Sequence, residues 1–127
     1  MKLYPRDLGD CGSVQMLSAG TVKFDTEEAS AGIELYKLPA NIIVVGAHVE
    51  VTTAFNGTSP ALSVGVNDEV DDIVKASDVT AVTVGAYSVK TFSRFNETKV
   101  VKAKLFGSGV TEGEAEIYLE VVRCPAK

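Results

Sequence analysis

The sequence predicts an all-β fold, an antiparallel β-sandwich of jelly-roll type with one short helical turn near residues 68–76. Val, Ile and Thr supply 34 of the 127 residues, and these β-branched side chains fit a pleated surface better than a helix. Apolar and polar residues alternate with a period of two in several segments, which Gly and Asn separate. About eight short strands are too many for one flat sheet, so two packed sheets or a barrel are expected. An immunoglobulin-like sandwich is the second choice, because the chain has no Trp and no Cys pair at the expected spacing.

The N-terminal part of the chain shows no hydrophobic period. Residues 1–20 are therefore predicted to form an arm or extended segment, followed by a single β-sandwich domain over 21–127. Residues 21–25 are expected to form the first strand. Residues 33–38 are expected to form the second, because Pro39 lacks an amide hydrogen and suits a strand end.

The clearest predicted strand spans residues 42–55. Side chains of one parity are apolar and those of the other are mainly polar, which gives an inward set of Ile43, Val45, Ala47, Val49, Val51 and Phe55. Residues 42–45 are apolar on both faces, so a partner or a second sheet is expected to cover that end. Asn56-Gly57 predicts a tight turn, because both residues tolerate positive φ, and residues 61–66 are then expected to return as a hairpin.

Residues 68–76 differ from the strands around them. Val70, Ile73 and Val74 fall at helical spacing and Asp68 suits an N-cap, which predicts one or two helical turns. Residues 79–84 and 86–92 predict two further strands on either side of Gly85, a bend or a bulge.

The last predicted hairpin joins residues 101–105 to residues 114–121 through a Gly-rich loop. Both segments alternate clearly between apolar and charged side chains. In the expected register Lys104 lies opposite Glu114 and Lys102 opposite Glu116, and opposite charges across strands help to select a register.

Composition excludes several classes of function. The net charge of −5 argues against a nucleic-acid partner, since phosphate neutralisation needs a basic surface. No apolar run approaches the roughly 20 residues that span a bilayer, so no membrane partner is expected. The N-terminus lacks the apolar core of a signal peptide, and we therefore expect Cys11 and Cys124 to be reduced thiols rather than a disulfide.

Residues that could support catalysis are few. The one histidine, His48, shares a strand face with Glu50, but no nucleophile or metal ligand is evident beside them. The acidic group Asp68, Glu69, Asp71 and Asp72 misses the spacing of an EF-hand and is better explained as a helix start and a solvated face. We therefore predict no catalytic residues, no cofactor and no metal site, and we expect that the protein is not an enzyme.

One stretch, residues 37–79, has the sequence KLPANIIVVGAHVEVTTAFNGTSPALSVGVNDEVDDIVKASDV. A Leu-Pro step leads into a long strand, then a short strand ending in Val-Gly, then an acidic turn. With the C-terminal strands, this pattern resembles the small jelly-roll virion proteins of tailed bacteriophages, among them capsid decoration (cement) proteins. The resemblance covers about two-thirds of the chain, and residues 1–30 carry no part of it.

The resemblance implies a structural protein of the virion. It would be made in the host cytoplasm, lie on the capsid surface, bind the major capsid protein of the assembled shell and stabilise that shell as a homo-oligomer, a dimer or a trimer. The expected interface residues are Ile42, Val44, Phe92 and Phe106. The alternative is a head-fibre or tail-associated module that binds host glycans through exposed aromatic and polar groups in a loop-end pocket. A small barrel or cupin-like enzyme is least favoured, because it needs several histidines.

Overall fold

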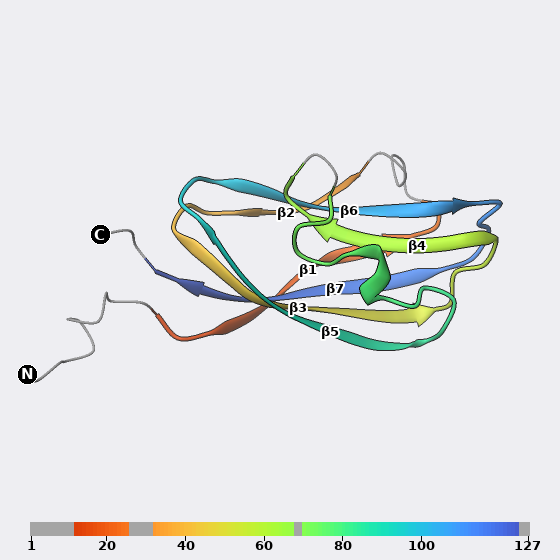
Figure 1. The fold of residues 1–127 in the computed structure, drawn as a ribbon, viewed down its shortest axis with the longest axis horizontal. Helices are drawn as coiled ribbons and strands as arrows, with labels where there is room; N and C mark the ends of the chain where they lie inside the picture. The colour runs from red at the N-terminus through yellow and green to blue at the C-terminus, as the bar shows by residue number, and fades with distance from the viewer. Residues whose placement is uncertain (1–11, 26–31, 68–69, 125–127) are drawn as a thin grey trace, which may run out of the picture.

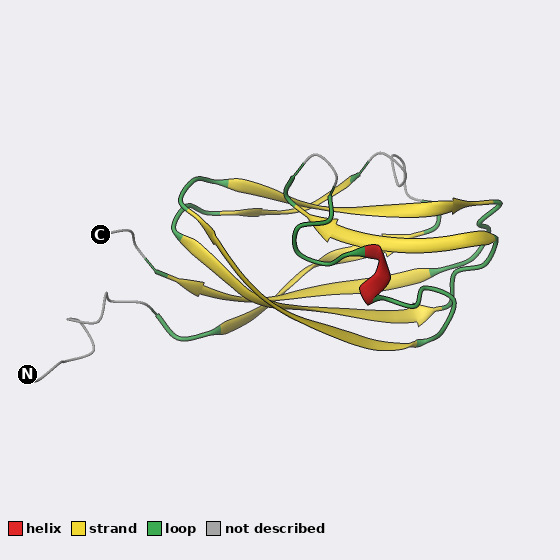
Figure 2. Ribbon diagram, viewed as in Figure 1, coloured by secondary structure: helices red, strands yellow, loops and turns green. Residues whose placement is uncertain are grey.

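Two antiparallel sheets packed face to face make up the structure (Figure 1). The computed structural model describes residues 12–25, 32–67 and 70–124. One sheet has four strands in the order β1-β7-β3-β5, and the other has three in the order β2-β6-β4. The strands are β1 (Gln15–Lys23), β2 (Ile33–Leu38), β3 (Ile42–Thr53), β4 (Thr58–Gly65), β5 (Gly85–Phe95), β6 (Lys99–Ser108) and β7 (Glu114–Arg123). Figure 2 shows how little helix accompanies them, and the predicted all-β sandwich is confirmed.

The strand order is that of a jelly roll. β1 pairs with β7, β2 with β6 and β3 with β5, so the pairs are nested along the chain. At the innermost level, Val64 of β4 forms an isolated antiparallel bridge with Val74. A long hairpin rolled over into two sheets gives this nesting, and Val74 occupies the place of an eighth strand.

The core lies between the two sheets. In β7 the alternation predicted from the sequence holds, because Ala115, Ile117, Leu119 and Val121 are buried. In β3 the predicted parity holds only from Ala47 onward. A register shift between Val44 and Gly46 reverses the inward and outward parity of the residues that precede it. Ile42 and Val44 therefore join the core, while Val45 is only half-buried. A bulge adds one residue to a strand and therefore moves all preceding side chains to the other face.

Both predicted hairpins are wrong. β3 and β4 lie in different sheets, as do β6 and β7, so each connection crosses the sandwich instead of turning back within a sheet. The expected pairing of Lys104 with Glu114 does not form. Glu114 instead lies 3.6 Å from Lys23 of β1, and Lys104 lies over the Phe106 ring at 5.1 Å. Alternation indicates which side chains are buried, but it does not identify the neighbouring strand.

The short helical turn is present but lies further along the chain than predicted. It spans Ala76–Asp78, and Asp78 accepts a hydrogen bond from the Lys75 amide at 3.0 Å. The predicted N-cap Asp68 and its neighbour Glu69 are outside the described residues. Residues 79–84 form no strand, because a turn closes between Thr80 and Thr83.

The N-terminal strand starts earlier than the sequence indicates. β1 begins at Gln15, so it includes residues 15–20 of the segment that we expected to be an arm or extended segment outside the sandwich domain. Residues 1–11 are outside the described part of the chain. A Gly at position 20 and a bulge at Ser18–Gly20 interrupt the alternation that would have revealed the strand.

The expectation of reduced thiols is wrong for Cys124, which is disulfide-bonded. The sequence holds one other cysteine, Cys11, which lies outside the described residues. None of the described helical structure has the length and hydropathy required to cross a bilayer.

Candidate functional site

A hollow of about 330 Å³ opens at one end of the sandwich. It lies where β1 and β3 end and β7 begins, at the right of Figure 1. One aromatic ring, one lysine, one threonine, one glycine and three carboxylates line it, from Lys23, Phe24, Asp25, Thr53, Glu112, Gly113 and Glu114. The hollow is thus built from three strand ends and the loop between β6 and β7.

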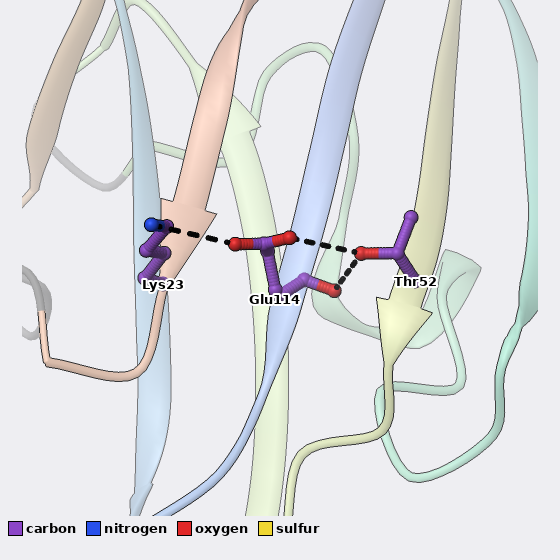
Figure 3. Close-up of polar contacts among 3 residues, drawn as sticks. All are labelled: Lys23, Thr52 and Glu114. Atoms are coloured by element: carbon purple, nitrogen blue, oxygen red, sulfur yellow. Dashed lines mark hydrogen bonds and ion pairs between the residues drawn. The ribbon is translucent and has the colours of Figure 1, made fainter.

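Glu114 ties the three strands together beside this hollow (Figure 3). Its carboxylate lies 3.6 Å from the Lys23 ammonium of β1. From β3, the Thr52 hydroxyl donates to the Glu114 carbonyl oxygen at 3.2 Å and to its Oε2 at 3.4 Å. Because these groups are partly exposed, they add little to stability, but they fix the position of the Glu114 side chain.

Asn56 holds the loop between β6 and β7 in place through three hydrogen bonds. Its Oδ1 accepts hydrogen bonds from the backbone amides of Thr111 at 2.7 Å and Glu112 at 3.0 Å. Its Nδ2 donates to the Thr111 hydroxyl at 2.8 Å. The Asn56 side chain, which predicts a local turn with Gly57, therefore serves mainly to hold Thr111, a residue 55 positions away in the sequence.

The wall of the hollow is also held by close packing at Gly113. The Phe24 amide donates to the Gly113 carbonyl at 3.1 Å. Gly113 has φ +142° and lies against the buried Phe55 ring, where a Cβ atom would overlap the ring. Only glycine combines this φ with so close an approach to the ring.

The chemistry of the hollow is that of a binding site. Phe24 is 38% exposed and presents an apolar surface, while Asp25 and Glu112 form no ion pair with any described residue. Carboxylates accept hydrogen bonds, and the lysine and threonine of the lining can donate them. Within the described ranges no group of three acidic, His or Cys side chains is arranged to hold a metal ion.

His48 has two partners that the sequence did not reveal. Its Nδ1 lies 2.7 Å from the Ser88 hydroxyl of β5, and its Nε2 lies 2.5 Å from Glu120 Oε1 of β7. Glu50, the partner suggested by strand parity, is not among them. Register decides this, because β3 places His48 opposite both Ser88 and Tyr118, and Glu120 is the diagonal neighbour.

This Ser88–His48–Glu120 set resembles a hydrolytic triad in composition only. It lies on the outward face of the four-stranded sheet, where the neighbouring backbone amides are directed along the ladder and cannot stabilise an oxyanion above the face. These residues lie neither in the Phe24 hollow nor in a second hollow of about 270 Å³, which residues 34–37 and Val100 line. The set therefore cross-links three strands.

Beside it, Tyr118 and Glu116 form a second polar group on the same face. The Tyr118 hydroxyl donates to Glu116 Oε2 at 2.6 Å. This hydrogen bond, with smaller contributions from desolvation and from the negative charges of Glu116 and Glu50, raises the pKa of Tyr118 above its ordinary value. Glu50 lies directly opposite Glu116 in the ladder, so like charges meet at the centre of this face.

The four predicted interface residues have different environments. Ile42 and Val44 are 5% and 0% exposed and fill the core of the chain itself, so they offer no surface to a partner. The second sheet explains these two residues of the apolar run at 42–45. Phe92 on β5 is 74% exposed and Phe106 on β6 is 37% exposed. Their role at an interface stays a prediction.

The acidic segment after β4 serves local structure where it is described. Asp72 Oδ1 accepts the Val66 amide at 2.7 Å, and Asn67 Oδ1 accepts the Asp71 amide at 3.1 Å. These bonds hold the chain as it leaves β4 and folds back to the Val74 bridge.

The fold is similar to chains of known viral capsid structures. A chain from the capsid asymmetric unit of cyanophage Pam1 has a TM-score of 0.65 and 22% identity, over 93% of this chain and 89% of that one. A chain from the acid-stable capsid of Helicobacter pylori bacteriophage KHP30 has a TM-score of 0.59 and 16% identity, over 90% of this chain and 95% of that one. A chain from the VP2 subviral particle of infectious bursal disease virus has a TM-score of 0.52 and 13% identity, over 91% of this chain and 33% of that one. No protein-family model matches the sequence, and no curated protein matches it. At these identities the comparisons show that this chain shares a jelly-roll fold with these capsid chains.

Proposed function

We propose that this protein is a structural component of a bacteriophage virion, a decoration (cement) protein that binds the assembled major-capsid shell and stabilises it. The observation that carries the proposal is the match in extent with the two phage chains. Alignment covers at least 89% of both partners in each comparison, so these are chains of nearly the same length with one fold. A small jelly roll is thus a module that phage capsid structures contain.

The physical properties of the molecule support this role. A protein that binds only the assembled shell stabilises it by mass action, and no chemical step is needed. A two-layer sandwich with a continuous, closely packed core rich in Val and Ile is stiff, which suits a clamp between neighbouring subunits. The sheet-face position of His48, outside both hollows, is compatible with such a role.

Phe92 is the strongest candidate for the contact surface. Among the described residues it is the most exposed large apolar side chain, and it lies on β5, whose second edge pairs with no other strand in the described sheets. An exposed aromatic residue on a free strand edge is a typical anchor for a protein partner. Phe92 would therefore contact either the shell or a second copy in a dimer or trimer.

The proposal is tested by adding the purified protein to expanded capsids of the phage that encodes it. We expect co-sedimentation with the capsids and a higher thermal transition of the shell, both reduced by Phe92→Ala. Leu17→Ala, which changes a half-buried residue on β1, controls for a general loss of stability. Binding to unassembled capsid subunits but not to shells would contradict the proposal.

Electron microscopy of particles with and without the protein distinguishes a capsid location from a head-fibre or tail location. Extra density over the shell that disappears with the protein supports a cement role. Density confined to a fibre or the tail would favour the alternative. A gene for the major capsid protein next to the gene for this chain would also support the capsid location, and we propose that the protein is made in the host cytoplasm before it joins the virion.

A further inference from the structure

We propose that the outward face of the four-stranded sheet docks a different protein, whose surface has an apolar centre and basic groups beside it. This inference deepens the proposed function and rests on it, because for a cement protein that partner is the capsid shell. The second sheet packs against the inward face, so the outward face is turned away from the rest of the sandwich (Figure 1).

One end of the outward face is apolar on all four strands. In β3, Ile42 and Val44 belong to the core, so Ile43 between them points outward. Ile43 is 8% exposed although it is not part of the core cluster, and its direct neighbours in the ladder are Val122 of β7 and Arg94 of β5. We define the outer patch as the apolar residues at this end, Val14, Met16, Ile43, Phe92 and Val122.

Strand parity places the other members of the outer patch on the same face. Met16 of β1 lies opposite Glu120, which is on the outward face, and is 60% exposed. Val14, two residues earlier, is 56% exposed, and Phe92 has the parity of Arg94 in β5 and is 74% exposed. Single exposed apolar side chains are common, but a group that extends over four adjacent strands marks an interaction surface.

Carboxylates occupy the other part of the same face. Glu120 borders the outer patch, and Glu50 lies opposite Glu116 in the ladder. Their row continues with Ala86 on β5 and Thr21 on β1, so no lysine or arginine lies beside Glu50 and Glu116 in it. A protein that covers the whole face is therefore held best when it places basic side chains over this part.

A second copy of the chain does not fit the whole face. A two-fold axis along the strands places β7 of one copy over β3 of the other, so Glu116 of each copy meets Glu50 of the other. Lys90 and Arg94 of β5 then lie over β1 and not over these carboxylates. A two-fold axis across the strands places the outer patch over the carboxylates and buries charge against apolar groups. The complementary partner is therefore a different protein.

The area of the face suits a protein partner. Four strands about 4.8 Å apart and ten residues at about 3.3 Å each give a flat area of roughly 600 Å². Stable interfaces bury about 800 Å² on each partner. The outer patch and the carboxylates together come near this value, so both belong to one docking surface.

The experiment is co-sedimentation of purified full-length variants with expanded capsids of the phage that encodes the protein. The double variant Met16→Gln/Val122→Thr makes two residues of the outer patch polar with little change of shape, and it should weaken binding about tenfold or more. Phe106→Gln is the control for the loss of an exposed apolar side chain. Phe106 lies on the other sheet, so this variant should bind as the wild type does.

A second pair of variants tests the charge. Glu50→Lys should weaken binding several-fold, because a lysine there repels a basic partner. Glu34→Lys makes the same change at an exposed residue of β2, on the other sheet, and should leave binding unchanged. If the double variant does not fold, this pair decides the question.

The outcomes separate this proposal from the proposed function. A wild type that does not bind shells would overturn both. Shell binding that a folded double variant retains in full would overturn only the docking face, and if Phe92→Ala then abolishes it, the contact lies at the β5 edge. A dimer in solution that the double variant dissociates would identify a second copy as the occupant and would also overturn this proposal.

Discussion

Gly113→Ala should be among the most destabilising single changes in this protein. Gly113 has φ +142°, and a methyl group there would overlap the Phe55 ring, which is 2% exposed and cannot move outward. Holding alanine in this backbone conformation costs about 1–3 kcal/mol. Forcing one more carbon into a packed site costs about 1–3 kcal/mol again. We therefore expect the free energy of unfolding to fall by about 2–6 kcal/mol.

Gly109→Ala is the matched control in the same connection between β6 and β7. Gly109 also has positive φ, +68°, but no heavy atom lies within 4 Å of the position that the added methyl group would occupy. Only the backbone penalty applies, roughly 1–2 kcal/mol. Urea denaturation at constant m-value measures both variants. For a chain of this size each kcal/mol lowers the melting temperature by about 3–5 °C.

The double mutant Phe55→Leu/Gly113→Ala separates strain from overlap. If the ring causes the loss, the smaller leucine accommodates the new methyl group, and the double mutant is more stable than the sum of the single changes predicts. Equal stability of Gly113→Ala and Gly109→Ala would refute the reasoning. Additivity of the two changes at Phe55 and Gly113 would show that backbone strain alone is responsible.

Three further predictions concern single groups. Asn56→Ala should lower the free energy of unfolding by about 1–3 kcal/mol in urea titrations, because two backbone amides lose their acceptor. Asn56→Asp keeps an acceptor and should lower it less. Equal losses for the two variants would contradict the role of Asn56 in holding the loop. Glu116→Gln should lower the pKa of Tyr118 in an ultraviolet titration. Because the folded-state pKa of Tyr118 lies above its ordinary value of 10.0, Tyr118 stabilises the wild type fully below pH 10.0 and progressively less as the pH rises through the folded-state pKa. This dependence should be weaker in the variant, where desolvation and Glu50 still act. Reduction of the Cys124 disulfide should lower the free energy of unfolding by up to about 4–5 kcal/mol, the value for a disulfide that closes most of the chain into one loop. An unchanged melting temperature in reductant would contradict this prediction.

Much of the fold could be predicted from the sequence because alternation records burial directly. Residues 114–121 have the buried and exposed parity that the sequence indicates, and the jelly-roll class follows from the number and length of such segments. The bulge in β3 could not be predicted, since one inserted residue leaves no mark on a run in which 42–45 are all apolar. The same ambiguity makes Ile42 and Val44 appear available to a partner.

The candidate site was largely hidden in the sequence. Lys23 lies far along the chain from Glu112 and Glu114, and only the pairing of β1 with β7 brings them together. The Asn56-Gly57 step is visible in the sequence, but it indicates a local turn and not the contacts of Asn56 with Thr111 and Glu112. His48 was visible as a single histidine, whereas Ser88 and Glu120 become its partners through the order β7-β3-β5.

Each strand with one solvent-facing and one buried side can be read from the sequence, because a period of two and β-branched side chains act within a segment. Only the folded arrangement shows which strands are neighbours, where the hollow opens and which charges meet. Pairing depends on contacts between residues far apart in the chain, and neither turn chemistry nor alternation specifies those contacts.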